Sequence, residues 1–300
     1  MRILVLGGSG MAGHVITTYL KEQQQQVTTL SARTKFDENT VLIDVSRQEQ
    51  LEKYLEGQHF DVVINCIGLL IEACEKYKEK AILINAYLPH YLSKYYENTP
   101  TKIIQLSTDC VFSGKRGPYK EEALVDGLLF YDRVKALGEL KNNKDLTLRM
   151  SIIGPDKNEE GIGLFNWFMK QKGTIYGFTN VYWNGITTIE LAHGIWQGIK
   201  ENITGLYHLV PTQSLSKYEL LLKFQKYFPR KNIQIEPREV EPINKVLINT
   251  RSDFSFKVGD YNQMLEEMKN WIEMHPTFYT HYLEWGENYE TFKSHDNRRD

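Results

Sequence analysis

Residues 7–13 read Gly7-Gly8-Ser9-Gly10-Met11-Ala12-Gly13 and follow a short apolar run, Arg2 to Leu6. The stretch contains the spacing GxGxxG as well as GxxGxxG, which end together at Gly13. Glycines at this spacing allow a tight turn, a close approach of the backbone to a phosphate, and close packing of the next helix on the strand. A helix that begins at Met11 would also offer free N–H groups and the positive end of its dipole. The pattern therefore predicts a dinucleotide-binding loop.

Short apolar runs alternate with helical patterns through the first half of the chain. Most runs are rich in Val, Ile and Leu without polar alternation, as expected where helices cover both faces of a parallel sheet. This alternation predicts an α/β fold with a doubly wound parallel sheet, the Rossmann arrangement. The predicted strands are Arg2 to Leu6, Val27 to Leu30, Val41 to Ile43, Val62 to Cys66, Lys102 to Ser107 and Leu146 to Met150. The predicted helices are Met11 to Gln24, Gln48 to Glu56, Glu75 to Asn98 and Phe130 to Lys141.

The character of the sequence changes after Gly154-Pro155, where glycines punctuate shorter, aromatic-rich segments. Two helical patterns follow, at Lys217 to Tyr227 and Tyr261 to Met274. We expect residues 1–154 to form the nucleotide-binding domain and residues 155–285 mainly a smaller C-terminal substrate-binding lobe, with segments around 181–210 returning to the first domain. Residues 286–300 are expected to form a polar tail.

Composition and charge exclude several classes of protein. The 300 residues carry 36 basic and 38 acidic side chains, so a net charge of −2 gives no electrostatic reason to expect nucleic acid or an anionic membrane as partner. Charges interrupt every apolar run before it could span a membrane. The three cysteines, Cys66, Cys74 and Cys110, form no CxxC pair, which favours a reduced, cytoplasmic setting. The eight histidines are scattered, and we expect no protein-bound metal.

The choice of dinucleotide is expected to be made at the end of the second strand. An acidic residue there would bind the ribose 2′-hydroxyl of NAD and repel a 2′-phosphate. The chain reads Thr29-Leu30-Ser31-Ala32-Arg33, with no carboxylate before Asp37. Because Ser31 can donate a hydrogen bond and Arg33 can pair with a phosphate, NADP(H) is favoured, with NAD as the alternative. Asp44 and Val45, after the third strand, are placed where such folds contact adenine.

Tyr131 and Lys135 lie four residues apart and would share one face of a helix. A free tyrosine has a pKa near ~10, and a neighbouring ammonium group favours the phenolate. We therefore expect Lys135 to lower the pKa of Tyr131 towards a range useful for proton transfer. Ser107-Thr108-Asp109 ends a predicted buried strand, where an open α/β sheet keeps its ligand crevice.

These residues together resemble the extended short-chain dehydrogenase/reductase family, and within it the dTDP-4-dehydrorhamnose reductases. The matching features run from Gly7–Gly13 through Asn65, Asn85, Ser107-Thr108-Asp109, Val111-Phe112-Ser113-Gly114, Tyr119 with Glu121, Tyr131 with Lys135, Ala136-Leu137-Gly138-Glu139 and Arg149. The resemblance covers residues 1–154 well and continues more loosely to about residue 209. It implies a nucleotide-sugar reductase of polysaccharide biosynthesis, with a homodimer kept as one option for its assembly.

The resemblance also implies roles for individual residues. Tyr131 would donate a proton to the carbonyl oxygen, Lys135 would bind the nicotinamide ribose, and Thr108 would hydrogen-bond the reacting oxygen. The implied cofactor contacts are Gly7, Gly10, Met11, Ala12, Gly13, Ser31, Arg33, Asp44, Val45, Cys66, Ile67, Gly68, Asn85 and Lys135. The implied substrate contacts are Asp109, Cys110, Val111, Phe112 and Trp183.

Cys110 leaves two alternatives open. Related nucleotide-sugar dehydratases carry Glu at this position, so its replacement disfavours dehydration. Similar epimerase-reductases use a cysteine here with a histidine, and Cys110 could act as a base if its pKa were lowered. Residues 150–192 contain no His to act as its partner, and a buried, inert cysteine is the simpler interpretation. A third hypothesis is a non-catalytic nucleotide-binding regulator, similar to the regulatory subunit of methionine adenosyltransferase.

Overall fold

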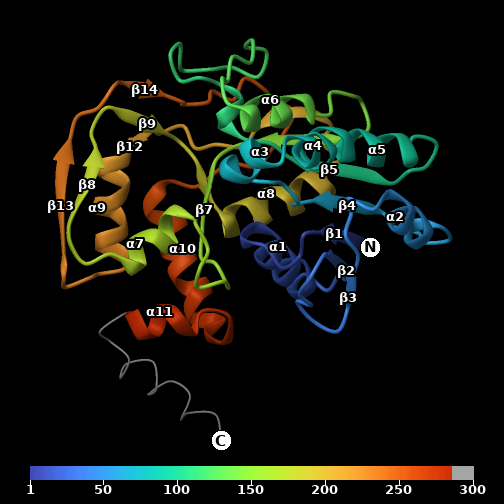
Figure 1. The fold of residues 1–300 in the computed structure, drawn as a ribbon, viewed down its shortest axis with the longest axis horizontal. Coiled ribbons are helices and arrows are strands. Elements are labelled where there is room, and N and C mark those ends of the chain that lie inside the picture. The colour runs from blue at the N-terminus through green and yellow to red at the C-terminus, as the bar shows by residue number, and fades with distance from the viewer. Residues whose placement is uncertain (286–300) are drawn as a thin grey trace, which may run out of the picture.

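A seven-stranded parallel sheet forms the centre of the molecule (Figure 1). The computed structural model describes residues 1–285, so the predicted polar tail lies outside the described residues. The strand order is β3-β2-β1-β4-β5-β6-β11, which confirms the predicted doubly wound α/β fold. The strands are β1 (Arg2–Leu6), β2 (Gln26–Ser31), β3 (Thr40–Leu42), β4 (Val62–Asn65), β5 (Lys102–Leu106), β6 (Leu146–Arg149) and β11 (Gly205–His208). The order reverses between β1 and β4, and in such sheets ligands bind beyond the carboxyl ends of the strands at this point.

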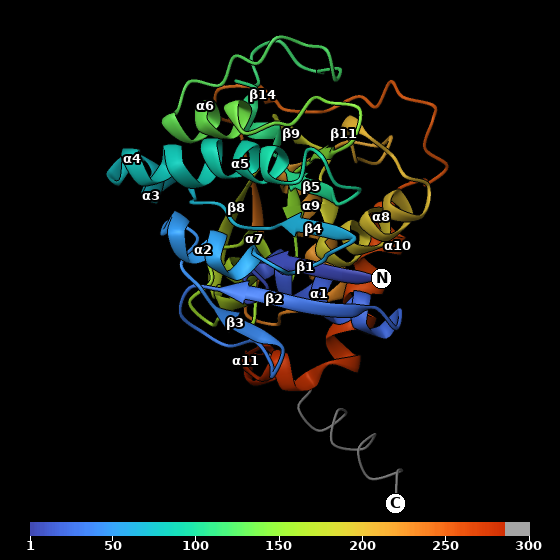
Figure 2. The ribbon, with the colours of Figure 1, turned by 90° about the vertical axis from the view of Figure 1, so that its right-hand side faces the viewer.

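Helices cover both faces of the sheet (Figure 2). On one face α1 (Met11–Glu22) packs against α8 (Thr188–Lys200). On the other face α2 (Gln48–Leu55) and α5 (Leu88–Tyr95) bury leucines against the opposite side of the strands. Burial on both faces explains why the strands are apolar without alternation, as the sequence predicted.

The predicted helix from Glu75 to Asn98 is wrong in one respect, because the chain forms several shorter pieces there. It consists of α3 (Ile71–Lys76), α4 (Lys78–Ala81), a π-helical turn, η1 (Ile82–Tyr87), and then α5. The wider π turn carries Asn85, which is 1% exposed and faces the loop after β4. The next helix, α6 (Phe130–Leu137), stops before Gly138, whose added Cβ would lie 2.0 Å from the Asn85 carbonyl oxygen. Close packing of α6 on the π turn thus ends that helix earlier than predicted.

A second lobe follows β6 and lies beside the sheet in Figure 1. Its helices α9 (Lys217–Tyr227) and α10 (Tyr261–Met274) have the predicted bounds, set by the side-chain caps Ser216 and Asp260. The lobe's strands are β7 (Ile152–Ile153), β8 (Gly173–Phe178), β9 (Val181–Trp183), β10 (Ile186–Thr187), β12 (Leu215–Ser216), β13 (Ile233–Arg238) and β14 (Ile243–Asn244). Its remaining helices are α7 (Leu164–Lys170), α11 (Thr280–Trp285) and the short turn η3 (Pro276–Phe278).

Two elements from this half of the chain pack with the first half. Strand β11 pairs with β6 at the sheet edge, and α8 packs on α1. The division into domains at residue 154 remains a prediction. Among residues 1–285, none of the helices combines the length and the apolar character that a membrane span requires.

Candidate functional site

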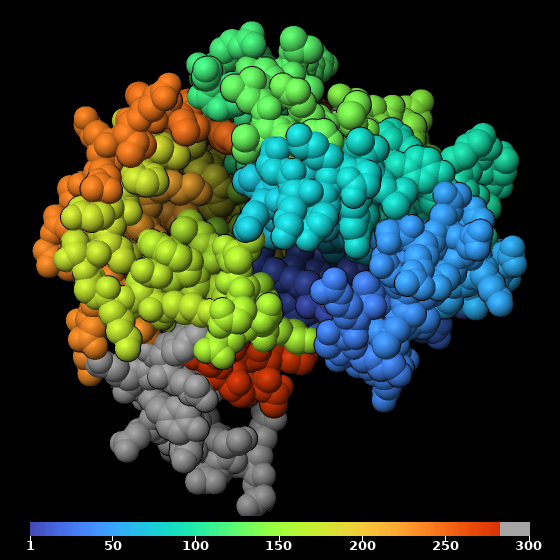
Figure 3. All heavy atoms as spheres, viewed as in Figure 1, coloured from blue at the N-terminus to red at the C-terminus, as the bar shows by residue number. Residues whose placement is uncertain are grey.

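The glycine loop lies between β1 and α1, at the bottom of a hollow that Figure 3 shows between the first lobe and the second. Gly7 has a φ of +81°, a conformation that side-chain-bearing residues rarely adopt. A Cβ on Gly13 would lie 2.1 Å from the Gly7 carbonyl oxygen. The loop is thus shaped so that glycine is required at positions 7 and 13, and it leaves the first N–H groups of α1 free to bind phosphate. A dinucleotide fits this geometry.

Ser31 ends β2 and Arg33 follows it, beside the glycine loop. The Ser31 hydroxyl lies 3.0 Å from the Ser9 hydroxyl of the loop itself. Arg33 is exposed, as a group that binds a ligand phosphate would be. Asp44 accepts hydrogen bonds from the hydroxyl and N–H of Ser46, at 2.7 and 3.0 Å, and the hydroxyl contact above all lowers its pKa. Val45 is nearly buried beside it.

The loop after β4 contains the predicted contacts Cys66, Ile67 and Gly68. Asn85 fixes this loop, because its amide accepts from the Leu69 N–H at 2.8 Å and donates to the Leu69 carbonyl at 2.9 Å. An added Cβ on Gly68 would lie 3.9 Å from the Lys135 Nζ, so this loop borders the predicted catalytic lysine. Burial raises the pKa of the Cys66 thiol to about 12, so Cys66 is an uncharged residue of this loop.

Thr108, Tyr131 and Lys135 come together at the carboxyl end of β5. Thr108 donates to the Asp109 carboxylate at 3.2 Å and accepts the N–H of Cys110 at 3.1 Å, and its hydroxyl interacts with Tyr131. The Lys135 ammonium group is buried and donates to the Leu106 carbonyl at 2.7 Å. Helix α6 supplies Tyr131 and Lys135 from one face, as their spacing predicts.

The expected effect of Lys135 on Tyr131 is wrong for this structure. Burial raises the pKa of Tyr131 above its usual value, the neighbouring Cys110 raises it further, and the interaction with the Thr108 hydroxyl only partly opposes this rise. Burial also lowers the pKa of Lys135 to about 8. Desolvation of the phenol therefore outweighs any stabilisation of the phenolate, and Tyr131 holds its proton at neutral pH.

The predicted substrate contacts divide into two groups. Asp109 and Cys110 lie beside Thr108 and Tyr131, and burial above all raises the pKa values of both, that of Cys110 to about 11. Val111 and Phe112 are 0% exposed, since their side chains pack into the core. A contact between these two residues and a substrate would therefore come from their main chain, and it stays a prediction. Trp183 is 3% exposed.

Two lysines of the second lobe reach this site, and the sequence did not indicate them. Lys217, the first residue of α9, holds its Nζ 4.3 Å from the ring centre of Trp183 and interacts with Asp109 and Cys110. Lys245 follows β14, and its ammonium group interacts with Cys110 and Asp109. Both lysines lie far from the motifs in the sequence. A single sequence does not distinguish a lysine that enters a site from a lysine on the surface. Only the tertiary structure distinguishes them.

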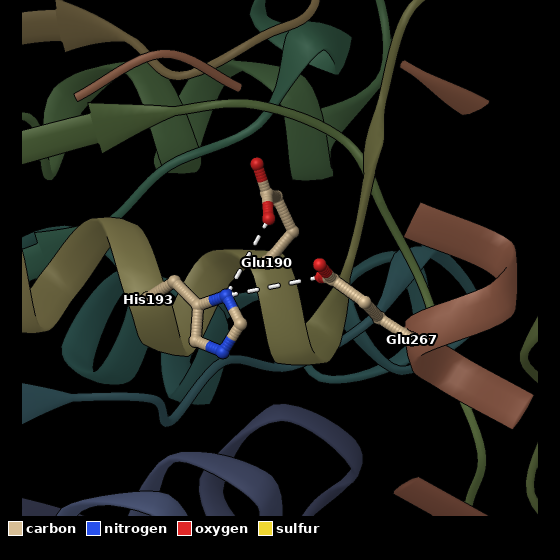
Figure 4. Close-up of side chains that lie close together, drawn as sticks. All are labelled: Glu190, His193 and Glu267. Carbon is tan, nitrogen blue, oxygen red and sulfur yellow. Dashed lines mark ion pairs between the residues drawn. The ribbon is translucent and has the colours of Figure 1, made fainter. Parts of the chain in front are cut away.

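Figure 4 shows a separate group of side chains on α8 and α10. Glu190, His193 and Glu267 each place one potential ligand atom within 4.8 Å of the others. His193 Nδ1 lies 3.6 Å from a Glu190 oxygen and 3.9 Å from a Glu267 oxygen. Sequence spacing does not reveal this group, because Glu267 is remote from the other two residues along the chain. The expected absence of a metal stays a prediction.

The sheet, the glycine loop at its switch point and the second lobe define a dinucleotide-binding protein of the doubly wound α/β class. Within this class the chain belongs to the family described as "RmlD substrate binding domain", which matches residues 1–253.

Known proteins similar to this chain fall into two kinds. The "Probable low-salt glycan biosynthesis reductase Agl14" of Haloferax volcanii is 30% identical over 51% of this chain and 54% of that protein, so the chain spans about half the length of this curated relative. "Methionine adenosyltransferase 2 subunit beta" of Xenopus tropicalis is 24% identical over 81% of this chain and 76% of its own length. Among solved structures, a dTDP-4-dehydrorhamnose reductase from Bacillus anthracis in complex with NADP has a TM-score of 0.75. It is 20% identical and covers 89% of this chain and 98% of its own, which shows the shared fold.

Proposed function

We propose that this protein uses NADPH to reduce the 4-keto group of a nucleotide-linked deoxysugar. The observation that carries the proposal is the buried group of Thr108, Tyr131 and Lys135 at the carboxyl end of β5. It faces the same sheet edge as a tightly packed glycine loop at the start of α1, where a phosphate can bind. The family and the glycan-synthesis reductase among its relatives support the same reaction and the same substrate class.

The residues divide the work between proton donation, positioning and cofactor binding. Bound NADPH supplies a hydride to the ketone carbon. Tyr131 is protonated at neutral pH and donates its proton to the oxygen, which is the direction that reduction needs. Thr108 orients the Tyr131 hydroxyl and can hydrogen-bond the same oxygen. Lys135, between Leu106 and the loop at Gly68, would hold the nicotinamide ribose, and its position beside that loop supports this role.

The preference for NADPH rests on Ser31 and Arg33. Ser31 is held beside the glycine loop by Ser9, and Arg33 is exposed next to it. A 2′-phosphate would find a hydroxyl donor and a guanidinium group there, whereas NAD would find no carboxylate for its 2′-hydroxyl.

Recognition of the sugar falls to charged groups from both lobes. Asp109 from the first lobe can accept hydrogen bonds from sugar hydroxyls. Lys217 and Lys245 from the second lobe can donate to its oxygens, and Lys217 covers the Trp183 ring that the sequence assigned to this task. A hexose is thus held between an acceptor on one side and donors on the other.

The test is NADPH oxidation with a panel of nucleotide 4-ketosugars. We expect Tyr131→Phe to lower kcat by about a hundredfold or more, because it removes the proton donor and keeps the ring. Tyr261→Phe is the matched control, since Tyr261 is also buried but lies on α10. Absence of turnover on every substrate, or full activity of Tyr131→Phe, would contradict the proposal.

The regulatory hypothesis deserves the same panel because the methionine adenosyltransferase subunit aligns along most of this chain. A regulator would bind the dinucleotide and consume none. Binding of NADPH without turnover on any substrate, in a protein that retains Thr108, Tyr131 and Lys135, would favour that function.

A further inference from the structure

A buried chain of hydrogen bonds runs from the C-terminal helices to the dinucleotide loop. The Trp271 Nε1 donates to the Tyr279 hydroxyl oxygen at 2.9 Å. The Tyr279 hydroxyl lies 2.7 Å from His14 Nε2, and His14 Nδ1 lies 2.9 Å from the Gly10 carbonyl oxygen. His14 and Tyr279 are 0% exposed and Trp271 is 3% exposed.

The chemistry of the end groups fixes every proton in this chain. An indole N–H can only donate, and a carbonyl oxygen can only accept. The Tyr279 O–H must therefore donate to His14 Nε2, and the His14 Nδ1–H must donate to Gly10. Burial lowers the pKa of His14 to about 4, in keeping with a neutral ring. If the ring were protonated, His14 Nε2–H and Trp271 Nε1–H would both donate to the Tyr279 oxygen. The Tyr279 hydrogen would then have no acceptor within this chain of hydrogen bonds.

Gly10 is the residue whose orientation matters most for a phosphate ligand. It caps α1, and its carbonyl also accepts the backbone N–H of His14 at 3.0 Å. Because a trans peptide is planar, the direction of the Gly10 carbonyl fixes the opposite direction of the Met11 N–H. That N–H is one of the backbone N–H groups in the first turn of α1 that have no partner within the helix. These groups would point at a phosphate when one is bound.

The same C-terminal residues hold other walls of the cleft. His275 reaches Glu22 at the far end of α1, at 2.8 Å. The Tyr282 hydroxyl accepts the N–H of Asp156, in the loop that approaches Met11 at Gly163. Residues 271–282 thus contact α1 at both ends and also the loop beside it.

We propose that His14, Tyr279 and Trp271 are positioning residues of the dinucleotide site. They fix the Met11 N–H on the cofactor's pyrophosphate, which makes residues 271–282 a working part of that site. The inference rests on the proposed use of a dinucleotide, but it needs no turnover to be tested.

The experiment compares Tyr279→Phe with Tyr261→Phe in the full-length protein. Both remove one buried tyrosine hydroxyl close to α10, but the Tyr261 hydroxyl has no hydrogen-bond partner among the described residues. We expect Tyr279→Phe to raise the Kd for NADPH by about tenfold, the size of one lost hydrogen bond. Tyr261→Phe should stay within about twofold of wild type. Thermal unfolding of the wild type and both variants is measured first, so that binding is compared at a temperature at which every protein is folded.

Hydrogen exchange gives a second readout, because coupling between two sites is reciprocal. NADP⁺ should slow amide exchange in residues 276–282 of the wild type, and this protection should be lost in Tyr279→Phe. Trp271→Phe removes the terminal donor together with part of the indole ring, keeps the Tyr279 hydroxyl, and serves if Tyr279→Phe does not fold. Equal NADPH affinity in wild type and the folded variant, with unchanged exchange, would overturn this inference alone. A wild-type chain that bound no dinucleotide would overturn the proposed function as well.

Discussion

Tyr131 illustrates how a residue's surroundings decide its chemical role. The spacing to Lys135 suggested an easily ionised tyrosine, but burial beside Cys110 and Asp109 raises its pKa instead. A tyrosine that keeps its proton is suited to donate it, so the structure supports reduction more directly than the expected phenolate did. The role proposed for the lysine is then on the cofactor side, in keeping with its place between Leu106 and Gly68.

Cys110 is expected to be dispensable. Its pKa is raised to about 11 by burial, so at neutral pH it is a thiol and a poor base even with Lys245 beside it. We expect Cys110→Ser to keep kcat within about threefold, with the same product stereochemistry, since a general base would contribute far more. The measurement is NADPH oxidation followed by NMR of the product. Loss of activity together with an altered sugar configuration would point to epimerisation.

At the scale of elements, the sequence predicted regular segments well and tertiary adjustments poorly. The strands around the glycine loop and the helices α9 and α10 follow from apolar runs, glycines and capping residues, all of which are local signals. The π turn at Ile82–Tyr87 was missed because its cause is the contact of Asn85 with the loop after β4, which no local pattern encodes. Lys217 and Lys245 were missed for the same reason.

The glycine loop permits a graded test of close packing. A Cβ on Gly13 would lie 2.1 Å from the Gly7 oxygen, whereas one on Gly10 would meet that oxygen at 3.4 Å, an ordinary contact. We expect Gly13→Ala to lower the unfolding free energy by about 1–3 kcal/mol, because backbone would have to move. Gly10→Ala should change it little. Denaturant unfolding measures both, and equal effects would show that the loop adapts.

The whole molecule is expected to lose stability in acid. Burial holds the pKa of His14 near 4, below its ordinary value, so the unfolded chain binds more protons between about pH 6.5 and 4. Stability therefore falls as the pH drops through this range, and His14 accounts for about 2 kcal/mol of the loss between pH 7 and 5. The lowered pKa of buried His208 acts in the same direction.

Denaturant midpoints at several pH values, in wild type and two variants, check this expectation. His14→Gln should flatten the dependence on pH, whatever its effect on stability at pH 7. His59→Gln is the control, because His59 is exposed and should leave the slope unchanged. An unaltered slope in His14→Gln would show that other groups govern the acid sensitivity.

The edge strand β11 has a consequence for how this chain is made. Residues 205–208 pair with β6, which is separated from them by more than 50 residues of intervening chain. On the ribosome the first six strands of the sheet emerge before β11. Until β11 emerges, one edge of β6 is unpaired and apolar, and edges of this kind can pair with other chains. A fragment cut at residue 154 would carry that open edge permanently. Strand β11, although it comes late in the chain, thus closes an edge that would otherwise be open to pairing between molecules.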